Sequence, residues 1–392
     1  MTGDASTTGS GRPAHGNEHD ISTQDGAMTV FTRPEIQRRL YSLRTEMARR
    51  RIDATLLTSV SGVAYYSGRT PGPHGGTCAV AVTSIDRDIV SGDFLPTIRR
   101  ILRRGRDTVS VVGIEDESLP LAMRQRIQDA LPHVLLVDMS RPLERLQQVR
   151  STEEVEVLRI SARISALVGQ TVATAIHERA FELDVTHAGI GVMLQQMAQE
   201  VPNGEQGHAW TSVRSGINTS YDQAWPTTRR ISNGDILSFS PFPMVAGYGA
   251  AVRRTLRLGE PEARALQVWS INMRVRRHAL ELIRPGATCR KIEQELDEIY
   301  AEHDLRHLSV RRRRVGVLAH PYGQRTDREM VRDSDTAFGP GMLVSLCPTV
   351  TVAKHEPEAS TYGETDVLLV NETGAELLTA LPAGPEHNLL MV

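Results

Sequence analysis

Cys347 stands at the end of the strand-like segment MLVSLCP, and its thiol could act as a nucleophile. A thiolate forms when a nearby positive charge or base stabilises it, a role that Arg253 or His320 could fill. Two other interpretations stay open for Cys347: a redox-labile thiol, or a small apolar side chain that fills a buried strand position. Arg253 itself suits an anionic substrate such as a carboxylate or a phosphate.

The segment around this arginine, GDILSFSPFPMVAGYGAAVRRT at residues 234–255, predicts a sheet hairpin. The apolar run at 236–239, after a Gly-Asp turn, is typical of a strand. Pro241 and Pro243 cannot lie in an interior strand, so we expect a kink or a sheet edge there. The Gly-Tyr-Gly segment lets the chain turn back into a second strand over residues 251–258. The inner face of such a hairpin can carry a site.

The length of 392 residues suggests two domains. A hydrophobic content of 40% suffices for large cores, and a net charge of -2 argues against nucleic-acid binding through bulk charge. Cys78, Cys289 and Cys347 lie far apart in the sequence, which indicates no disulfide framework and fits a reducing cytoplasm. We find no apolar run of membrane-spanning length and no apolar signal core, so we expect a cytoplasmic protein that does not enter a membrane.

Three regions follow one another along the chain. Residues 1–28 are rich in Gly, Ser, Thr, Asp and His, which predicts a disordered N-terminal arm. Residues 29–150 alternate strand-like runs such as CAVAVT and VLLVDM with arginine-rich helical segments, which predicts an α/β domain. Residues 151–392 open with the capping box Ser151-Thr-Glu-Glu154 of a long helix and return to strand patterns in MLVSL, TVTVA and DVLLV.

Several motifs resemble the creatinase, prolidase and methionine aminopeptidase superfamily. The most specific are SGINT at residues 215–219, FPMVAGY followed by RTL, the RPGATC turn, and GPEHN near the end. Within that superfamily the sequence is most similar to creatinase, the member that hydrolyses creatine without a metal. The resemblance covers roughly residues 33–388. It implies an α+β pita-bread domain, a curved antiparallel sheet with outer helices, preceded by a smaller α/β domain.

The resemblance also identifies the five positions at which the metallopeptidases of the superfamily hold their metal ions. In this sequence they read Ser240, Ala251, Arg313, Cys347 and Glu364. Serine is a weak neutral donor and alanine has no donor, so we expect no metal cofactor and no metallopeptidase activity.

Creatinase-like catalysis needs a proton-transferring histidine shortly after SGINT, and the matching position holds Gln223. Glutamine cannot carry a proton, so Asp222 or His208 could replace the histidine; the alternative is that both are ordinary loop residues. A second family histidine matches His320 in LAHPYG, and Tyr322 follows it as in the family pattern.

The two glutamates that hold the guanidinium of creatine correspond to Arg253 and Cys347. An arginine repels a guanidinium cation in a poorly solvated pocket, so we expect that creatine is not the substrate. An anionic substrate fits Arg253 better. The alternative is an ion pair between Arg253 and Glu364, which matches the last family carboxylate.

Further substrate-binding candidates come from the same resemblance. The family histidine of the pocket wall falls on or near Arg313, within the arginine run 311–314, and Trp210 precedes SGINT in a creatinase-like segment. In creatinase a loop of the partner subunit reaches the site; here that loop is GRTPGPHGGT, with His74 and Arg69 as candidates. The alternatives are that the arginine run 311–314 is a solvated surface loop and that His74 is simply an exposed loop residue. The resemblance also predicts a homodimer.

Two hypotheses of different classes follow. The first is a metal-independent enzyme that hydrolyses, eliminates or cyclises at a C–N bond of a small, carboxylate-bearing metabolite, in a role that would suit specialised metabolism. Its catalytic candidates are His320, Glu364, Asp222 and Cys347. The second is a catalytically silent homologue that serves as a binding or partner protein, because the family base and both guanidinium-binding carboxylates are replaced together.

Overall fold

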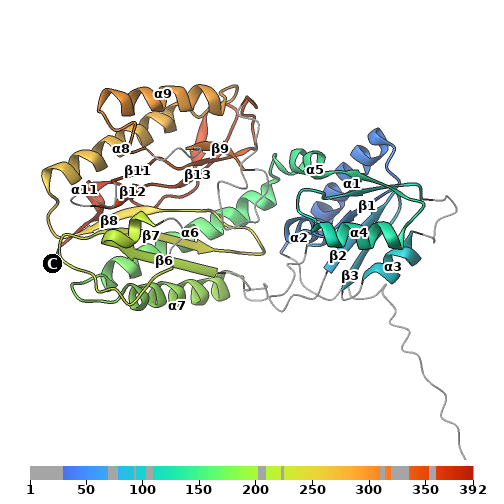
Figure 1. Cartoon of the computed structure of the whole chain (residues 1–392), viewed down its shortest axis with the longest axis horizontal. Helices are drawn as coiled ribbons and strands as arrows, with labels where there is room; N and C mark the ends of the chain where they lie inside the picture. The colour runs from blue at the N-terminus through green and yellow to red at the C-terminus, as the bar shows by residue number, and fades with distance from the viewer. Residues whose placement is uncertain are drawn as a thin grey trace, which may run out of the picture.

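The structure is a computed structural model. It describes residues 30–68, 78–91, 94–102, 109–201, 209–221, 225–309, 314–318, 335–352 and 359–391. The arm predicted over residues 1–28 lies outside the described residues. Figure 1 shows two lobes, the first built from the blue and teal segments and the second from the green to red segments.

The first lobe contains a five-stranded sheet in the order β3-β2-β1-β4-β5. Its strands are β1 (Ala54–Leu57), β2 (Cys78–Thr83), β3 (Arg87–Ser91), β4 (Val111–Ile114) and β5 (Leu135–Asp138). Its helices are α1 (Arg33–Arg50), α2 (Val60–Ser67), α3 (Phe94–Ile101), α4 (Leu121–Ala130) and α5 (Ser140–Gln147). β1 pairs antiparallel with β2 and parallel with β4, so the sheet is mixed. The predicted alternation of strands and helices is confirmed, while the domain bounds themselves stay a prediction.

The second lobe places its sheets between two pairs of helices (Figure 1). Its helices are α6 (Thr152–Ala175), α7 (Glu182–Glu200), the 3-10 helix η1 (Gly216–Ser220), α8 (Ala263–Leu282), α9 (Cys289–Glu302) and α11 (Pro385–Asn388). Its strands are β6 (Ala209–Ser215), β7 (Ile236–Pro243), β8 (Arg254–Leu258), β9 (Val315–Val317), β10 (Leu343–Leu346), β11 (Thr349–Thr351), β12 (Thr361–Gly363), β13 (Asp366–Val370), β14 (Ala375–Leu377) and β15 (Leu389–Leu390).

The strands of this lobe pair mostly with antiparallel neighbours. Within the described ranges the sheet orders are β15-β8-β7-β6, β14-β13-β10-β9 and β11-β12, and the β15–β8 pair is parallel. Helices α6 and α7 cover β6 and β7, and α8 and α9 lie on the opposite side of the lobe (Figure 1). None of the helices in the described part of the chain is both long and apolar enough to cross a lipid bilayer.

Helix α6 begins where the capping box predicts. The hydroxyl of Ser151 accepts a hydrogen bond from the Glu154 N–H, and the Glu154 carboxylate accepts one from the Ser151 N–H. Both donors would otherwise lack a partner at the helix start. Glu154 also accepts a hydrogen bond of 3.1 Å from the Tyr248 hydroxyl, so the same side chain fixes the turn between β7 and β8.

The strands β7 and β8 form the predicted hairpin, but β7 continues through Pro241 and Pro243 without a kink that ends the strand. β7 pairs with β6 as far as Pro243 but with β8 only over residues 236–239. The prolines therefore lie where the β8 side of the strand is open, which confirms the predicted sheet edge while β7 continues as one strand. The chain turns at Ala246 and Gly247, whose φ angles are 50° and 82°. The residues on either side of this turn exchange backbone hydrogen bonds of 2.8 Å.

This turn also packs against the first lobe. The ring of Tyr248 lies 5.0 Å from that of Phe31, and the guanidinium of Arg39 lies 4.1 Å from the centre of the Phe31 ring. Arg39 is buried and pairs with Glu35 at 2.7 Å. The FPMVAGY motif thus helps to join the lobes, which places its tyrosine in the interface between them.

Candidate active site

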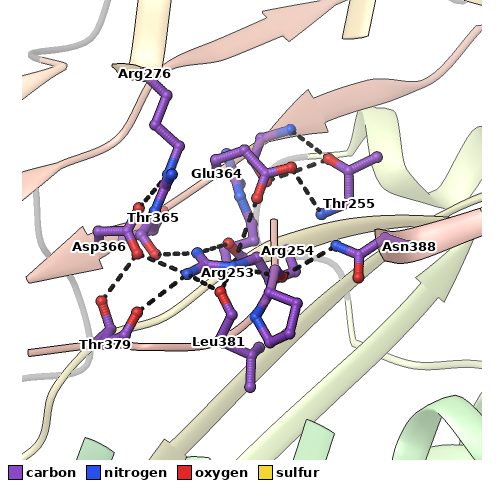
Figure 2. A network of polar contacts seen from close by, with 12 residues as sticks. Arg253, Arg254, Thr255, Arg276, Glu364, Thr365, Asp366, Thr379, Leu381 and Asn388 are labelled. Atoms are coloured by element: carbon purple, nitrogen blue, oxygen red, sulfur yellow. Dashed lines mark hydrogen bonds and ion pairs between the residues drawn. The ribbon is translucent and has the colours of Figure 1, made fainter. Parts of the chain in front are cut away.

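A buried network of charges lies between β8, β13 and α8 (Figure 2). Asp366 Oδ1 accepts a hydrogen bond of 2.6 Å from Arg254 Nη2 and one of 2.9 Å from the Thr379 hydroxyl, and Oδ2 accepts one of 2.6 Å from Arg276 Nε. Burial opposes the charge of Asp366, but the two arginines outweigh it and hold the pKa of this carboxyl below its ordinary value. The network therefore keeps an ionised aspartate inside the protein.

Arg254 extends this network to the last part of the chain. Its guanidinium donates to the carbonyl oxygen of Leu381 at 2.8 Å and to that of Thr365 at 2.8 Å, as Figure 2 shows. Only 1% of the side chain is exposed. Because one side chain contacts β8, β13 and the chain after β14, it fixes the relative position of the elements around Glu364.

Glu364 is the fully buried carboxyl next to this network. Its Oε1 accepts hydrogen bonds from the Trp269 indole N–H at 3.2 Å and from the Thr255 N–H at 3.4 Å. Its Oε2 lies 3.8 Å from Arg254 Nε and has no hydrogen-bond partner among the described residues. Burial raises the pKa of Glu364 to about 7, although the charge of Arg254 works in the opposite direction. This carboxyl can therefore hold or release a proton near neutral pH.

Arg253 precedes β8 and bridges to Thr365, with backbone hydrogen bonds of 3.3 and 2.9 Å. Its Nη2 donates to the Thr349 hydroxyl at 2.7 Å, and its guanidinium packs so closely against Gly363 that a Cβ there would collide with it. The sequence left open an ion pair between Arg253 and Glu364. Among the described residues, the arginine within ion-pair distance of Glu364 is Arg254.

Cys347 lies one residue beyond β10 and is half-buried. Its sulfur is 3.3 Å from the Ser345 hydroxyl, and its carbonyl accepts a hydrogen bond from Thr349, the residue that Arg253 contacts. Its N–H donates to the carbonyl of Arg314. Cys347 and Arg253 are thus joined through Thr349, but whether the thiol is a nucleophile, a redox-labile group or a packing residue stays open.

Arg314 is the member of the predicted arginine run that the structure describes. It is buried rather than solvated, and its Nε donates to Glu293 of α9 at 2.7 Å. A second contact joins its Nη2 to Asp297. The alternative of a solvated surface loop is therefore wrong for this residue, because two carboxylates of α9 compensate its charge.

Trp210 lies on the face of β6 that points away from α7. Successive residues of a strand point to opposite faces, and Thr211 of this strand lies against Gly189 of α7, where a Cβ would come within 3.0 Å of the threonine methyl group. Trp210 stacks on Phe242 of β7 with 5.9 Å between ring centres. Ser240, at one of the family's metal-ligand positions, lies opposite Ser212 in the same pair of strands.

The SGINT segment is shaped by Glu182, a buried residue of the first turn of α7. Its carboxylate accepts hydrogen bonds from the Ser215 N–H at 2.6 Å, the Asn218 side chain at 3.0 Å and the Thr227 hydroxyl at 2.8 Å. The turn then places the hydroxyl of Thr219 to accept a hydrogen bond of 2.9 Å from the backbone of β12. Glu182 thus fixes the segment that precedes Asp222 and Gln223.

The other candidates from the sequence lie outside the described residues. They are His320, Asp222, His208, Gln223, Tyr322, Arg313, His74 and Arg69. The structure joins Arg253 to Cys347 through Thr349 and places Arg253 against Gly363, the residue before Glu364. The functional roles of all these residues stay predictions.

Sequence reasoning missed the partners of the buried carboxyls. Trp269 and Arg276 lie two turns apart on α8, and therefore on one face of the helix. An arginine on the buried face of a helix, and Asp366 at the start of the apolar run DVLLV, are signals of a buried ion pair. These two signals could have revealed the network, but not its connection to Glu364.

Comparisons with known proteins identify the family of this chain. The sequence model of metallopeptidase family M24 matches residues 156–372, more than half of the chain. A creatinase from Bacillus sp. (strain B-0618) is 37% identical over 389 residues, which cover 92% of this chain and 94% of that protein. This chain belongs to metallopeptidase family M24.

Solved structures of M24 relatives share the fold at low sequence identity. The Xaa-Pro dipeptidase from Bacillus anthracis superposes with a TM-score of 0.76 at 17% identity, covering 91% of this chain and 100% of that one. The prolidase from Pyrococcus horikoshii OT3 superposes with a TM-score of 0.73 at 16% identity, covering 88% and 99%. These likenesses confirm the predicted α+β pita-bread fold.

The name of the M24 family refers to metallopeptidases. Whether a metal ion fits this member depends on which donor atoms stand at the five metal-ligand positions of the family. Ala251 offers no donor atom, and Ser240 offers a neutral hydroxyl. Glu364 keeps its carboxylate, but Trp269 and Arg254 already contact its two oxygens. Within the described part of the chain, no group of three or more His, Cys, Asp or Glu side chains could hold a metal ion. Among the described residues, the donors at these positions therefore do not form a set that fits a divalent metal.

We expect the purified protein to contain no stoichiometric zinc, manganese, cobalt or iron, and EDTA to leave its Tm unchanged. The reason is that a bound metal stabilises the folded state in proportion to its affinity, and this donor set offers little. Elemental analysis and thermal unfolding with and without EDTA measure both quantities. A content of about one metal ion per chain, lost together with stability in EDTA, would contradict the prediction.

Proposed function

We propose that this M24 member is a creatinase-like hydrolase that works without a metal at a C–N bond of a small, carboxylate-bearing metabolite other than creatine. The close relation to a creatinase over nearly the whole length supports this class. The observation that carries the proposal is the buried carboxyl of Glu364, with its raised pKa, directly after the residue that Arg253 contacts. The guanidinium of Arg253 packs against Gly363, the residue directly before the buried Glu364. A guanidinium thus lies against the residue that precedes this carboxyl, while the charge within ion-pair distance of Glu364 is that of Arg254.

The two side chains have different roles in this proposal. Arg253 holds the carboxylate of the substrate, because a guanidinium forms short, charge-assisted hydrogen bonds with carboxylates. Glu364 exchanges a proton with the reacting group, since burial raises its pKa to about 7, where both protonation states are populated near neutral pH. Oε2 is the oxygen that would exchange this proton, because Oε1 already accepts hydrogen bonds from Trp269 and Thr255.

The rest of the proposed site comes from the sequence. His320 and Asp222 are the further proton carriers, Cys347 is the fourth catalytic candidate, and elimination or cyclisation at the C–N bond stays an alternative to hydrolysis. The remaining substrate contacts are Gln223, Tyr322, Arg313, Trp210, and, from the partner copy of a homodimer, Arg69 and His74.

We expect the site to prefer an anion to a guanidinium cation. Titration calorimetry with succinate and with methylguanidinium measures this preference. Arg253→Gln should weaken succinate binding by roughly tenfold or more, because a charged hydrogen bond is lost. Arg159→Gln is the matched control, since Arg159 is 36% exposed and pairs with Glu376 on the surface. Tighter binding of methylguanidinium, or release of urea from creatine, would show that the assignment of Arg253 is wrong.

Activity measurements separate an enzyme from a silent binding protein. Release of amine or ammonia is followed for a panel of N-acyl and ureido amino acids, with EDTA present throughout. The proposal predicts turnover of a member of the panel, and a loss of about a hundredfold in Glu364→Gln, as expected when a general acid or base is removed. If the protein binds members of the panel but cleaves none, or if Glu364→Gln is equally active, the proposed mechanism is wrong.

A further inference from the structure

Two buried polar atoms on the inner face of β6 lack hydrogen-bond partners among the described residues. They are the indole nitrogen Nε1 of Trp210 and the hydroxyl oxygen of Ser212. Only 7% of Ser212 is exposed. The two residues are separated by one position in a strand, so their side chains lie on the same face. Because buried polar groups are nearly always paired, two unpaired donors side by side indicate a place prepared for an acceptor.

A rigid aromatic wall stands beside these donors. Phe242 stacks on Trp210 with an angle of 27° between the ring planes. Phe242 also lies against Gly249, where a Cβ would come within 2.7 Å of the ring. Phe242 is 4% exposed and contacts both Trp210 and Gly249, so it restricts the orientation of the indole. The indole N–H is a donor and cannot bind a cation, which excludes this atom as a metal ligand.

The donors lie at a defined separation from Arg253. Ser212 faces Ser240 of β7, and β8, which Arg253 precedes, lies on the other side of β7. Two strand spacings separate β6 from β8, which corresponds to about 10 Å. A ligand held at its carboxylate by Arg253 would therefore reach Ser212 only if it extended by about the length of an N-acylated amino acid, and Trp210 lies two residues, or about 7 Å, further along β6.

We propose that Trp210 and Ser212 bind an uncharged, planar, acceptor-bearing group of the substrate, such as the carbonyl of an aromatic or unsaturated amide. The indole N–H and the serine hydroxyl donate to the acceptor, and the indole ring contacts the planar group. This inference deepens the proposed function and rests on it, because it assumes that Arg253 holds the carboxylate at the other end. The substrate class is then an N-acylated amino acid rather than a small guanidino acid.

Binding of N-benzoylglycine and of acetate, measured by titration calorimetry, tests this subsite. N-benzoylglycine carries the planar amide and the carboxylate, and acetate carries the carboxylate alone. Trp210→Phe keeps an aromatic ring and removes the N–H, and Ser212→Ala removes the hydroxyl. Each change should weaken N-benzoylglycine by roughly fivefold to tenfold, as the loss of one hydrogen bond does, and should leave acetate unchanged.

Two further variants make the result unambiguous. Trp225→Phe changes a tryptophan that is 80% exposed and should affect neither ligand. Arg253→Gln should weaken both ligands, and if it weakens neither while Trp210→Phe still weakens N-benzoylglycine, the proposed function fails and the subsite stands. Equal binding of N-benzoylglycine by the wild type, Trp210→Phe and Ser212→Ala, or an equal loss for both ligands at an unchanged Tm, would overturn the subsite.

Discussion

Replacing Asp366 with alanine is expected to lower the free energy of unfolding by about 3–5 kcal/mol. Asp366 is fully buried, and its two oxygens compensate the charges of Arg254 and Arg276 through hydrogen bonds of 2.6 Å each. Removing the carboxylate leaves two buried guanidinium groups without their charge partner, which is more unfavourable than the loss of the hydrogen bonds alone. Urea unfolding at neutral pH, followed by circular dichroism, measures the change.

A surface pair provides the control for this prediction. Glu376→Ala removes the partner of Arg159, whose side chain is 36% exposed, and should change stability by less than about 1 kcal/mol. Asp366→Asn keeps the shape and removes the charge, so a large loss in this variant identifies charge compensation as the cause. A loss below about 1 kcal/mol for Asp366→Ala would mean that water or a shift of the arginines compensates the charge.

Glu364→Gln is expected to remove a pH dependence of stability of about 3 kcal/mol between about pH 5 and pH 8. In the folded protein the pKa of Glu364 is raised to about 7 by burial, above the value of 4.5 for an exposed glutamate. The folded state therefore binds the proton more tightly than the unfolded state. The resulting stabilisation is fully present below the unfolded pKa and is lost as the pH rises through about 7.

Urea unfolding of both proteins across this pH range tests the prediction. The side-chain oxygen of glutamine can still accept hydrogen bonds from Trp269 and Thr255. The loss of the negative charge near Arg254 changes the free energy of unfolding of the variant by an amount that does not depend on pH, because glutamine does not titrate. Relative to the wild type, Glu364→Gln should therefore become more stable as the pH rises. Glu372→Gln changes an exposed glutamate and should show no such trend. Parallel stability curves for the wild type and Glu364→Gln would show that Glu364 does not titrate in this range.

Local structure could be predicted from the sequence because its causes lie within a few residues. The capping box of Ser151 and Glu154 starts α6 through hydrogen bonds between residues three positions apart. The hairpin of β7 and β8 follows from an apolar run, a turn that accepts positive φ at Gly247, and a return strand. The motifs SGINT and FPMVAGY were sufficient to indicate the creatinase-like family and hence the fold, which the relatives confirm.

Only the tertiary structure decided which residues form hydrogen bonds and ion pairs with Arg253, Arg254 and Glu364. Neighbouring residues of a strand point to opposite faces, so Arg253 and Arg254 have different partners although they are adjacent in the sequence. Glu364 and Asp366 lie on either side of Thr365, which bridges to Arg253, and this register brings both carboxyls to Arg254 from more than a hundred residues away. The sequence by itself determined which elements form and which residues could do chemistry. Sheet register and burial decided that Glu364 lies beside Arg254 and Trp269 with a pKa near neutrality, because both depend on contacts between distant segments.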